Sequence, residues 1–131
     1  MWFHNSKKIV IDGIKFDSTI ESQYYIYLKE QKGLWNIMDF AIQPKYLLIT
    51  KFEKNWEKFR DMYYIADFLV IHKEWNFVVD IKWMPTEQSK IKRKLFCRKY
   101  DIPMKWLVKY KWEWISYFEN IKRRAREKRN K

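Results

Sequence analysis

The chain has 131 residues and a net charge of +12 at pH 7, because 28 lysines and arginines outnumber 16 acidic residues. A chain of this length supports one hydrophobic core, and a hydrophobic share of 47% excludes a wholly disordered protein. Its apolar runs of about five residues are far shorter than the ~20 that a membrane-spanning helix requires. The positive charge predicts a polyanionic partner, with nucleic acid as the leading candidate.

The single cysteine, Cys97, excludes an internal disulfide and is typical of a reducing compartment. Residues 1–10 lack the apolar stretch of a secretory signal, so we expect a cytoplasmic protein. We expect one domain over residues 1–121, followed by a basic tail over residues 122–131. The tail has seven basic residues and one acidic residue, which is half of the net charge. It is either a solvated helix end or an arm that contacts phosphates.

The first part of the chain predicts a hairpin followed by a helix. Asp12-Gly13 stands between two apolar triplets, and this pair favours a tight turn because both central positions need a positive φ. We expect the strands to cover Ile9–Ile11 and Ile14–Phe16. An apolar stripe at helical spacing then predicts a helix from Thr19 to about Lys32.

The middle of the chain predicts mainly strands. We expect a connection over residues 34–40, a strand over Tyr46–Thr50, and a charged loop or strand extension over Lys51–Arg60. β-Branched and aromatic residues over Tyr63–Ile71 and Phe77–Trp83 predict an antiparallel hairpin.

The last part predicts a helix over residues 87–100, with Ile91, Leu95 and Phe96 on its apolar side. A strand over Met104–Tyr110 and a helix from about Trp112 into the tail complete the chain. This order of elements predicts an α/β fold in which helices flank a mixed sheet. The strands before and after the 87–100 helix should be parallel, joined by a right-handed crossover.

Two aspartates, Asp67 and Asp80, interrupt the two strands of the predicted central hairpin. A carboxylate inside an apolar strand is costly unless it is paired or binds a cation. A turn centred near residues 73–74 pairs residues whose numbers add up to about 147, so Asp67 should face Asp80. Lys82 lies two residues beyond Asp80 and therefore projects from the same face. A register shift of one residue would separate these side chains.

The residues alone leave two interpretations open. The three side chains form either an ordinary Asp–Lys–Asp network on a half-exposed sheet or a metal site. Oxygen ligands favour Mg²⁺ or Mn²⁺, and the two isolated histidines, His4 and His72, do not form a zinc cluster. The sequence contains neither a glycine-rich phosphate-binding loop nor a nucleophile-elbow motif.

The order of these residues resembles the PD-(D/E)XK nuclease superfamily. Ala66-Asp67 precedes a strand–turn–strand unit that ends in Asp80-Ile81-Lys82. The chain also resembles a phage-associated branch of small, Holliday-junction-resolvase-like nucleases. The matching stretches, which together span about residues 9–100, are IDGIKFDSTIESQYY, IQPKYLL, YIADFLV, FVVDIK and KIKRKLF. Two positions depart from the pattern: Ala66 replaces the superfamily's proline, and Trp83 follows the lysine where a small residue is frequent.

The resemblance implies a restriction-endonuclease-like α-β-β-β-α-β core, with an N-terminal hairpin and a C-terminal basic helix beside it. It also implies DNA cleavage that depends on Mg²⁺ or Mn²⁺. The implied metal ligands are Glu21, Asp67, Asp80 and the Ile81 carbonyl, and the catalytic residues are those three acids with Lys82. Glu21 has a second interpretation, because Ser18 and Glu21 are also spaced as a capping box at the start of the first helix.

Several basic, polar and aromatic residues are candidates for DNA contacts. They are Gln43, Trp83, Lys90, Lys92, Lys94, Arg123, Arg124 and Arg126. The lysines and arginines would follow the phosphate backbone, which positions a substrate without reading its sequence. Gln43 matches a Gln-Pro pair of the resembling nucleases, and the indole of Trp83 can narrow the site or stack on a base.

We therefore expect a metal-dependent DNA endonuclease, encoded by a phage or mobile element and active in the cytoplasm of a bacterial host. Branched DNA is the expected substrate, as for a Holliday junction resolvase, and two symmetric cuts would require a homodimer. The alternative is a non-catalytic basic protein that binds nucleic acid. A third possibility is an interaction module that docks its tail on an acidic partner. The strand-interior aspartates favour cutting, because a pure phosphate binder gains nothing from anions there.

Overall fold

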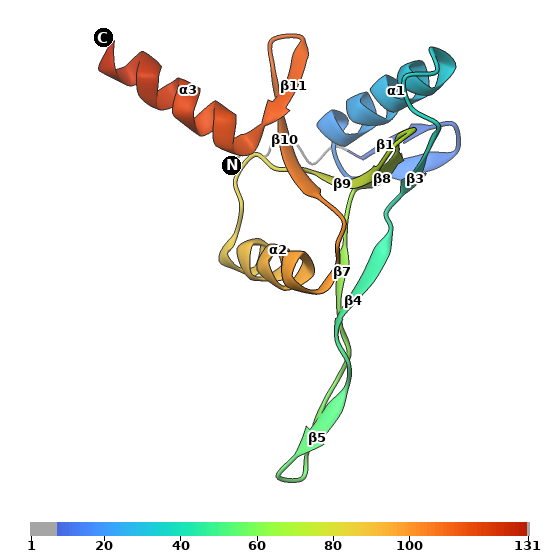
Figure 1. Cartoon of the computed structure of the whole chain (residues 1–131), viewed down its shortest axis with the longest axis vertical. Helices are drawn as coiled ribbons and strands as arrows, with labels where there is room; N and C mark the ends of the chain where they lie inside the picture. Colours follow the sequence, from blue (N-terminus) through green and yellow to red (C-terminus); the bar gives the residue numbers. More distant parts are fainter. Residues whose placement is uncertain (1–7, 131) are drawn as a thin grey trace.

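A computed structural model describes residues 8–130 (Figure 1). As predicted, a hairpin of β1 (Ile9–Ile11) and β2 (Ile14–Phe16) leads into helix α1 (Thr19–Gly33). Asp12 and Gly13 form the hairpin turn with φ values of 55° and 76°, the left-handed conformation that a two-residue turn requires. No helix among the described residues is long and apolar enough to cross a membrane.

A mixed five-stranded sheet in the order β11-β10-β9-β8-β3 forms the centre of the molecule. Its strands are β3 (Asp39–Ile42), β8 (Phe68–Ile71), β9 (Asn76–Ile81), β10 (Met104–Tyr110) and β11 (Glu113–Ser116). Strands β9 and β10 are parallel, whereas the other neighbouring pairs are antiparallel. Helix α2 (Glu87–Lys99) joins the parallel pair. The mixed α/β fold class and the parallel pairing are thus confirmed.

The two faces of this sheet pack against different helices. Val78 and Val79 are both fully buried and point to opposite faces, because side chains alternate along a strand. On one face, Val79 packs in a cluster with Leu28 of α1. On the other face, Val78 packs in a second cluster with Phe96 of α2. The site described below lies where β9 leaves these two cores.

Strands β3 and β8 belong to a hairpin that continues far beyond the sheet (Figure 1). Its next section pairs β4 (Lys45–Ile49) with β7 (Met62–Ile65), and its outermost section pairs β5 (Phe52–Lys54) with β6 (Glu57–Phe59). Residues 51–60, predicted as a charged loop or strand extension, thus form the end of a two-stranded ribbon.

The hairpin bends where it leaves the sheet, at Gln43-Pro44 on one strand and Ala66-Asp67 on the other. Gln43 N donates to Asp67 O at 2.9 Å, and Ala66 N donates to Pro44 O at 3.1 Å, so the two bends are held together. Proline cannot donate a ladder hydrogen bond, and Gln43 has a φ of 50°. The predicted continuous strand over Tyr63–Ile71 was therefore wrong, because Asp67 lies in a break between β7 and β8.

Three further expectations need correction. The predicted connection over residues 34–40 includes the start of β3, which pairs with β8 at the edge of the sheet. The final helix α3 (Tyr117–Arg129) does not begin near Trp112, because β11 intervenes and Ser116 caps the helix by accepting from Phe118 N. Ile91 is exposed rather than packed, since only Phe96 of α2 is buried.

Candidate active site

The bend places Asp67 beside Asp80. Strands β8 and β9 pair Phe68 with Val79 and Leu69 with Val78, which confirms the predicted register. Asp67 N donates to Asp80 Oδ1 at 2.9 Å, and Ile81 N donates to Asp67 Oδ2 at 2.8 Å. Each carboxylate is therefore fixed by the backbone of the opposite strand. Such mutual anchoring holds two acids together although their charges repel.

Asp80 is almost completely buried, with 2% of its surface exposed. Its Oδ2 accepts a hydrogen bond from the Tyr64 hydroxyl and lies 3.7 Å from Lys82 Nζ. The predicted convergence of Asp67, Asp80 and Lys82 is thus confirmed. Tyr64 was not predicted as part of the site, because the bend that brings β7 to Asp80 has no signature in the alternation of strand residues.

The surroundings of the two aspartates disfavour their charged forms. Burial raises the pKa of Asp67 to about 8, and the neighbouring carboxylates of Asp80 and Glu21 act in the same direction. Burial also raises the pKa of Asp80, although the Tyr64 hydroxyl and the Lys82 ammonium oppose this shift. Two carboxylates whose charged forms are disfavoured gain stability from a cation placed between them.

Glu21 lies in the first turn of α1, near this pair. Ser18 caps the helix, because its side chain accepts from Glu21 N at 3.2 Å. Burial raises the pKa of Glu21, and the charges of Asp17 and Asp80 raise it further. The capping role of Ser18 is therefore confirmed, while the Glu21 carboxylate lies within electrostatic range of Asp80.

Two hollows meet at Lys82. The larger, about 520 Å³, is lined by Glu21, Lys82, Trp83 and Lys109. The smaller, about 260 Å³, is lined by Asp80, Lys82 and Lys92 together with the Tyr64 ring. A group bound beside Lys82 would thus meet carboxylates from two directions and ammonium groups from β10 and α2.

The donor set fits a small, hard cation with few protein ligands. Within residues 8–130, no three His, Cys, Asp or Glu side chains form a group able to hold a metal ion. Mg²⁺ keeps several waters and usually takes one or two carboxylates. Asp67 and Asp80 provide these two, and Asp67 Oδ1 accepts no hydrogen bond from the described residues. Of the histidines, His72 is half-buried beside the β8–β9 turn, and His4 lies outside the described residues.

The predicted DNA contacts fall into three groups. Trp83 is 70% exposed on the larger hollow, and Lys92 lines the smaller one. Lys90 and Lys94 are exposed on α2, where Lys90 forms an ion pair with Glu87. Gln43 is exposed at the bend and lines neither hollow, so the structure does not bring its side chain into the site.

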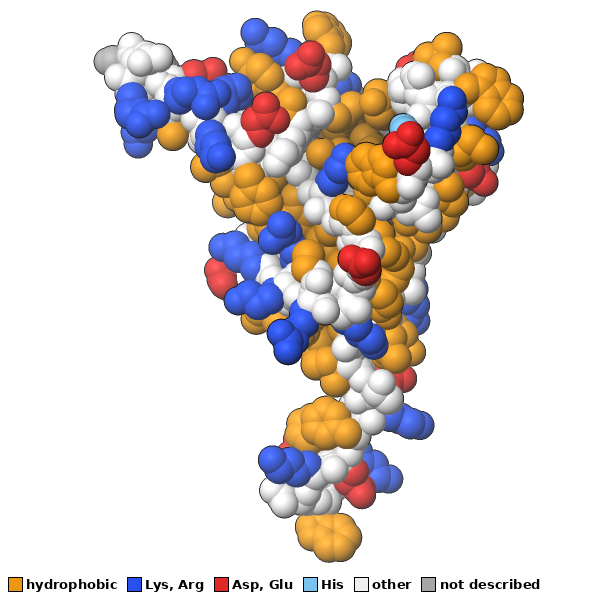
Figure 2. All heavy atoms as spheres, viewed as in Figure 1, with side chains coloured by type: hydrophobic (Ala, Val, Ile, Leu, Met, Phe, Trp, Pro, Cys, Tyr) orange, Lys and Arg blue, Asp and Glu red, His pale blue; other side chains and the backbone are white. Residues whose placement is uncertain are grey.

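The arginines of α3 differ from one another. Arg123 donates to Asn120 Oδ1, forms an ion pair with Glu127, and lies 3.8 Å from the centroid of the Tyr110 ring. Arg124 and Arg126 are exposed. Figure 2 shows lysine and arginine side chains gathered over α2 and α3. The basic tail is thus helical through residue 129 and continuous with the rest of α3.

Lys109 and Gln23 are lining residues that sequence reasoning missed. Lys109 Nζ donates to Gln23 Oε1 at 3.1 Å, and both residues line the larger hollow. The parallel register pairs Leu107 with Ile81, so its continuation sets Lys109 beside Trp83. Knowledge of that register would have identified the lysine.

Fold and site define a basic mixed α/β protein with a paired, partly buried set of carboxylates and an adjacent lysine. The chain belongs to the family described as "Protein of unknown function (DUF1064)", which matches residues 1–113. That span includes the acid pair and Lys82 but ends before α3. The chain matches no curated protein and no solved structure.

Proposed function

We propose that the protein is a divalent-metal-dependent DNA endonuclease built on a PD-(D/E)XK-type core. The observation that carries this proposal is the convergence of Asp67, Asp80 and Lys82. Burial raises the pKa of both acids and so disfavours their charged forms, whereas a cation would stabilise both charges. Perturbed acids beside a hollow are typical of catalytic sites.

Each residue of the site would have a distinct role. Asp67 and Asp80 would hold Mg²⁺ or Mn²⁺, with the Ile81 carbonyl as a further oxygen ligand. When bound, such a cation supplies Lewis-acid activation of water and of the phosphate. Lys82 would orient the attacking water and offset negative charge that develops on the phosphate. Glu21, across the larger hollow, would accept a proton or orient a water ligand.

The basic surface would position the substrate. Lys92 lines the smaller hollow, and Lys90 and Lys94 lie on the same helix. These ammonium groups, with Arg124 and Arg126 on α3, would follow the phosphate backbone without reading the sequence. On the resemblance described above, we take branched DNA as the substrate, a symmetric dimer as the active form, and a phage-encoded origin with action in the host cytoplasm.

The test compares four DNA substrates, namely a four-way junction, a flap, a linear duplex and a single strand, each with Mg²⁺ and with chelator. We expect cutting only with the metal, and we expect Asp80→Asn to abolish it while DNA binding persists. Asp39→Asn is the matched control, because Asp39 is an exposed strand aspartate that forms an ion pair with Lys32 and lies opposite Ile71, at the other end of β8 from Asp67. Equal cutting by wild type and Asp80→Asn would refute the enzyme.

A non-catalytic protein that binds nucleic acid remains the second candidate. It is favoured by one observation, namely that both Asp80 oxygens already have protein partners in Asp67 N, Tyr64 and Lys82. If this network needs no metal, the protein should bind DNA equally with Mg²⁺ and with chelator, and it should cut none of the four substrates. The same experiment therefore separates the two candidates.

A further inference from the structure

The outermost section of the long hairpin, residues 51–60, is here called the arm. Every residue of β5 and β6 is exposed, and Figure 1 shows the arm projecting beyond α2. The rings of Phe52 and Phe59 stack with centroids 4.6 Å apart, and the next two cross-strand positions place opposite charges face to face. An isolated two-stranded ribbon is only marginally stable in water. These cross-strand pairs therefore stabilise the hairpin of the arm without contacts to the central sheet.

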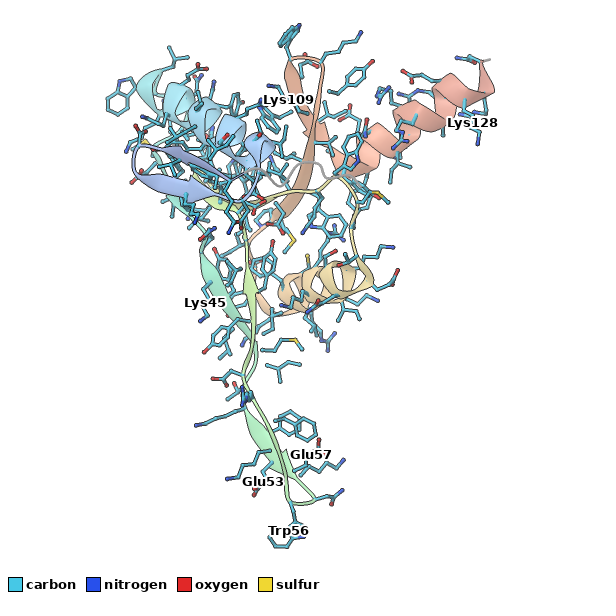
Figure 3. All side chains as sticks on the ribbon, turned by 180° about the vertical axis from the view of Figure 1, so that it is seen from behind. Lys45, Glu53, Trp56, Glu57, Lys109 and Lys128 are labelled. Carbon is cyan, nitrogen blue, oxygen red and sulfur yellow. The ribbon has the colours of Figure 1, made fainter. Side chains whose placement is uncertain are left out.

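The tip of the arm carries a tryptophan that folding does not explain. Trp56 is 95% exposed, and Figure 3 shows it at the far end of the molecule. Asn55 and Trp56 have φ values of 51° and 67°, the left-handed conformation of a tight hairpin turn. Asparagine tolerates this conformation and glycine adopts it freely, whereas a bulky side chain is strained there. The indole thus strains the turn and buries nothing in its own chain, which indicates a partner.

The charge of the arm favours a polyanion as that partner. Residues 51–60 contain four basic and two acidic residues. The ribbon is also tied to the basic helix α2, since Lys99 Nζ and the Tyr100 hydroxyl both donate to Leu47 O of β4, at 2.9 and 2.7 Å. Positive charge therefore continues from α2 toward the arm. An aromatic group among cations is the combination that binds exposed nucleobases.

A short segment of the chain connects the tip of the arm to the acid pair. Eleven residues lead from Trp56 to Asp67. At a rise of roughly 3.3 Å per residue, the backbone of the tip reaches at most about 36 Å from Asp67. This corresponds to about ten base pairs of B-DNA, because each step along the duplex rises about 3.4 Å.

We propose that Trp56 stacks on an unpaired nucleobase of the DNA substrate, within about ten base pairs of the phosphate that is cut. The proposal rests on the proposed function and adds the chemistry that the arm recognises. A fully paired duplex hides the faces of its bases in the stack, whereas a base without a partner offers one. Stacking of this kind is insensitive to base identity, because every base has a π-face.

The experiment uses two duplexes with equal numbers of phosphates. In one, 2-aminopurine is opposite thymine, and in the other it is opposite an abasic site. With chelator present to prevent cutting, we expect wild-type protein to bind the abasic-site duplex about tenfold more tightly and to quench the 2-aminopurine fluorescence. We expect Trp56→Gly to lose both the preference and the quenching, while its affinity for the paired duplex changes less than twofold.

The controls exclude unfolding. Trp56→Gly creates an Asn-Gly turn, which is the preferred sequence for this conformation, so the arm should keep its fold. Trp112→Ala removes an indole of similar exposure, 90%, from the β10–β11 turn, and it should keep the full preference. Trp56→Phe retains an aromatic ring and should retain part of the preference.

Three outcomes would overturn the inference. The first is an equal preference for the abasic-site duplex in wild type and Trp56→Gly. The second is a difference in sedimentation between the two free proteins, which would assign Trp56 to contact with a second copy of the chain. The third is failure of wild type to bind either duplex, which would also overturn the DNA-directed function. A Trp56-dependent preference without any cutting would instead support the arm and refute only the nuclease.

Discussion

The two ends of the long hairpin, formed by one continuous stretch of chain, have opposite properties. At the inner end, Phe68 and Val70 of β8 are buried and lock the strand into the sheet. At the outer end, every side chain of β5 and β6 is exposed. The inner end therefore holds Asp67 N within hydrogen-bond distance of Asp80 Oδ1, whereas the outer end leaves the Trp56 side chain exposed. The first environment suits the catalytic site that we propose, and the second suits the substrate contact that we propose.

The largest expected effect contrasts Phe68 with Phe52. Phe68→Ala removes a fully buried ring and should lower the free energy of unfolding by about 3–5 kcal/mol. Phe52→Ala removes only the stacking partner of Phe59 and should cost about 1 kcal/mol or less. Urea denaturation of both variants measures the difference. Similar losses of unfolding free energy in the two variants would show that the arm is part of the core, contrary to the difference described between the two ends of the hairpin.

The second expected effect concerns pH. The folded state raises the pKa of Asp67 from 3.8 to about 8, so between these values the folded protein holds a proton that the unfolded chain releases. Without metal, stability should therefore fall as pH rises from about 4 to about 8, by up to ~1.4 kcal/mol per pH unit for each such proton.

Thermal melting at several pH values, with chelator and with Mg²⁺, checks this expectation. Asp67→Asn should flatten the decline, because the amide cannot ionise. Mg²⁺ should stabilise wild type more at pH 8 than at pH 5, since ligand carboxylates must lose their protons to bind it. A decline that is unchanged in Asp67→Asn would assign the pH dependence to other groups.

The sequence was sufficient to predict most of the elements and the pairing of the acids. Asp12-Gly13 and the helical stripe after Ser18 are local signals, so the hairpin and α1 could be located within a residue or two. The register that sets Asp67 opposite Asp80 follows from the centre of a short turn. These features depend on interactions between residues near one another in the chain.

The bend and the distant partners could not be predicted in this way. Gln43-Pro44 meets Ala66-Asp67 only because two strands leave the sheet together, and this brings Tyr64 to Asp80. Lys109 reaches the site through the parallel pairing of β9 with β10, which are joined through α2 rather than by a short turn that would fix the register. The turn at Asn55-Trp56 was missed because tryptophan is unfavourable at a positive φ, and this local conflict is one reason for the role that we propose for the arm.

A third prediction tests how the Tyr64 hydroxyl affects the pKa of Asp80 at the inner end of the hairpin. Tyr64→Phe removes the hydroxyl that opposes the rise in the pKa of Asp80, so the carboxylate should ionise at higher pH. We expect about tenfold weaker Mg²⁺ affinity, a typical loss for a group that orients a metal ligand. The pH profile of cutting should move to higher pH. The measurement is the cutting rate as a function of Mg²⁺ concentration and pH.

Tyr46→Phe is the control for this variant. Tyr46 packs in the same cluster, and its ring stacks on Tyr64 with centroids 6.4 Å apart, but its hydroxyl does not contact Asp80. Its Mg²⁺ affinity should remain that of wild type. Equal losses in both variants would mean that packing of the tyrosines, rather than the hydrogen bond, supports the site.

The smallest expected effect contrasts two adjacent arginines of α3. Arg123 is engaged by Asn120, Glu127 and the Tyr110 ring, whereas Arg124 is exposed and forms no ion pair within the described residues. Arg124→Ala should lower the slope of log affinity against log salt by about 0.9, the value for one lost phosphate contact. Arg123→Ala should leave that slope nearly unchanged and instead weaken the helix.

DNA affinity measured over a range of salt concentrations, with circular dichroism of each variant, separates these effects. Equal slopes for wild type and Arg124→Ala would place α3 away from the phosphates. A lower slope for Arg123→Ala alone would show that binding releases Arg123 from its partners toward the DNA. In that case Arg123 would stabilise α3 in the free protein and contact a phosphate in the complex, so one residue would serve both the fold and the partner.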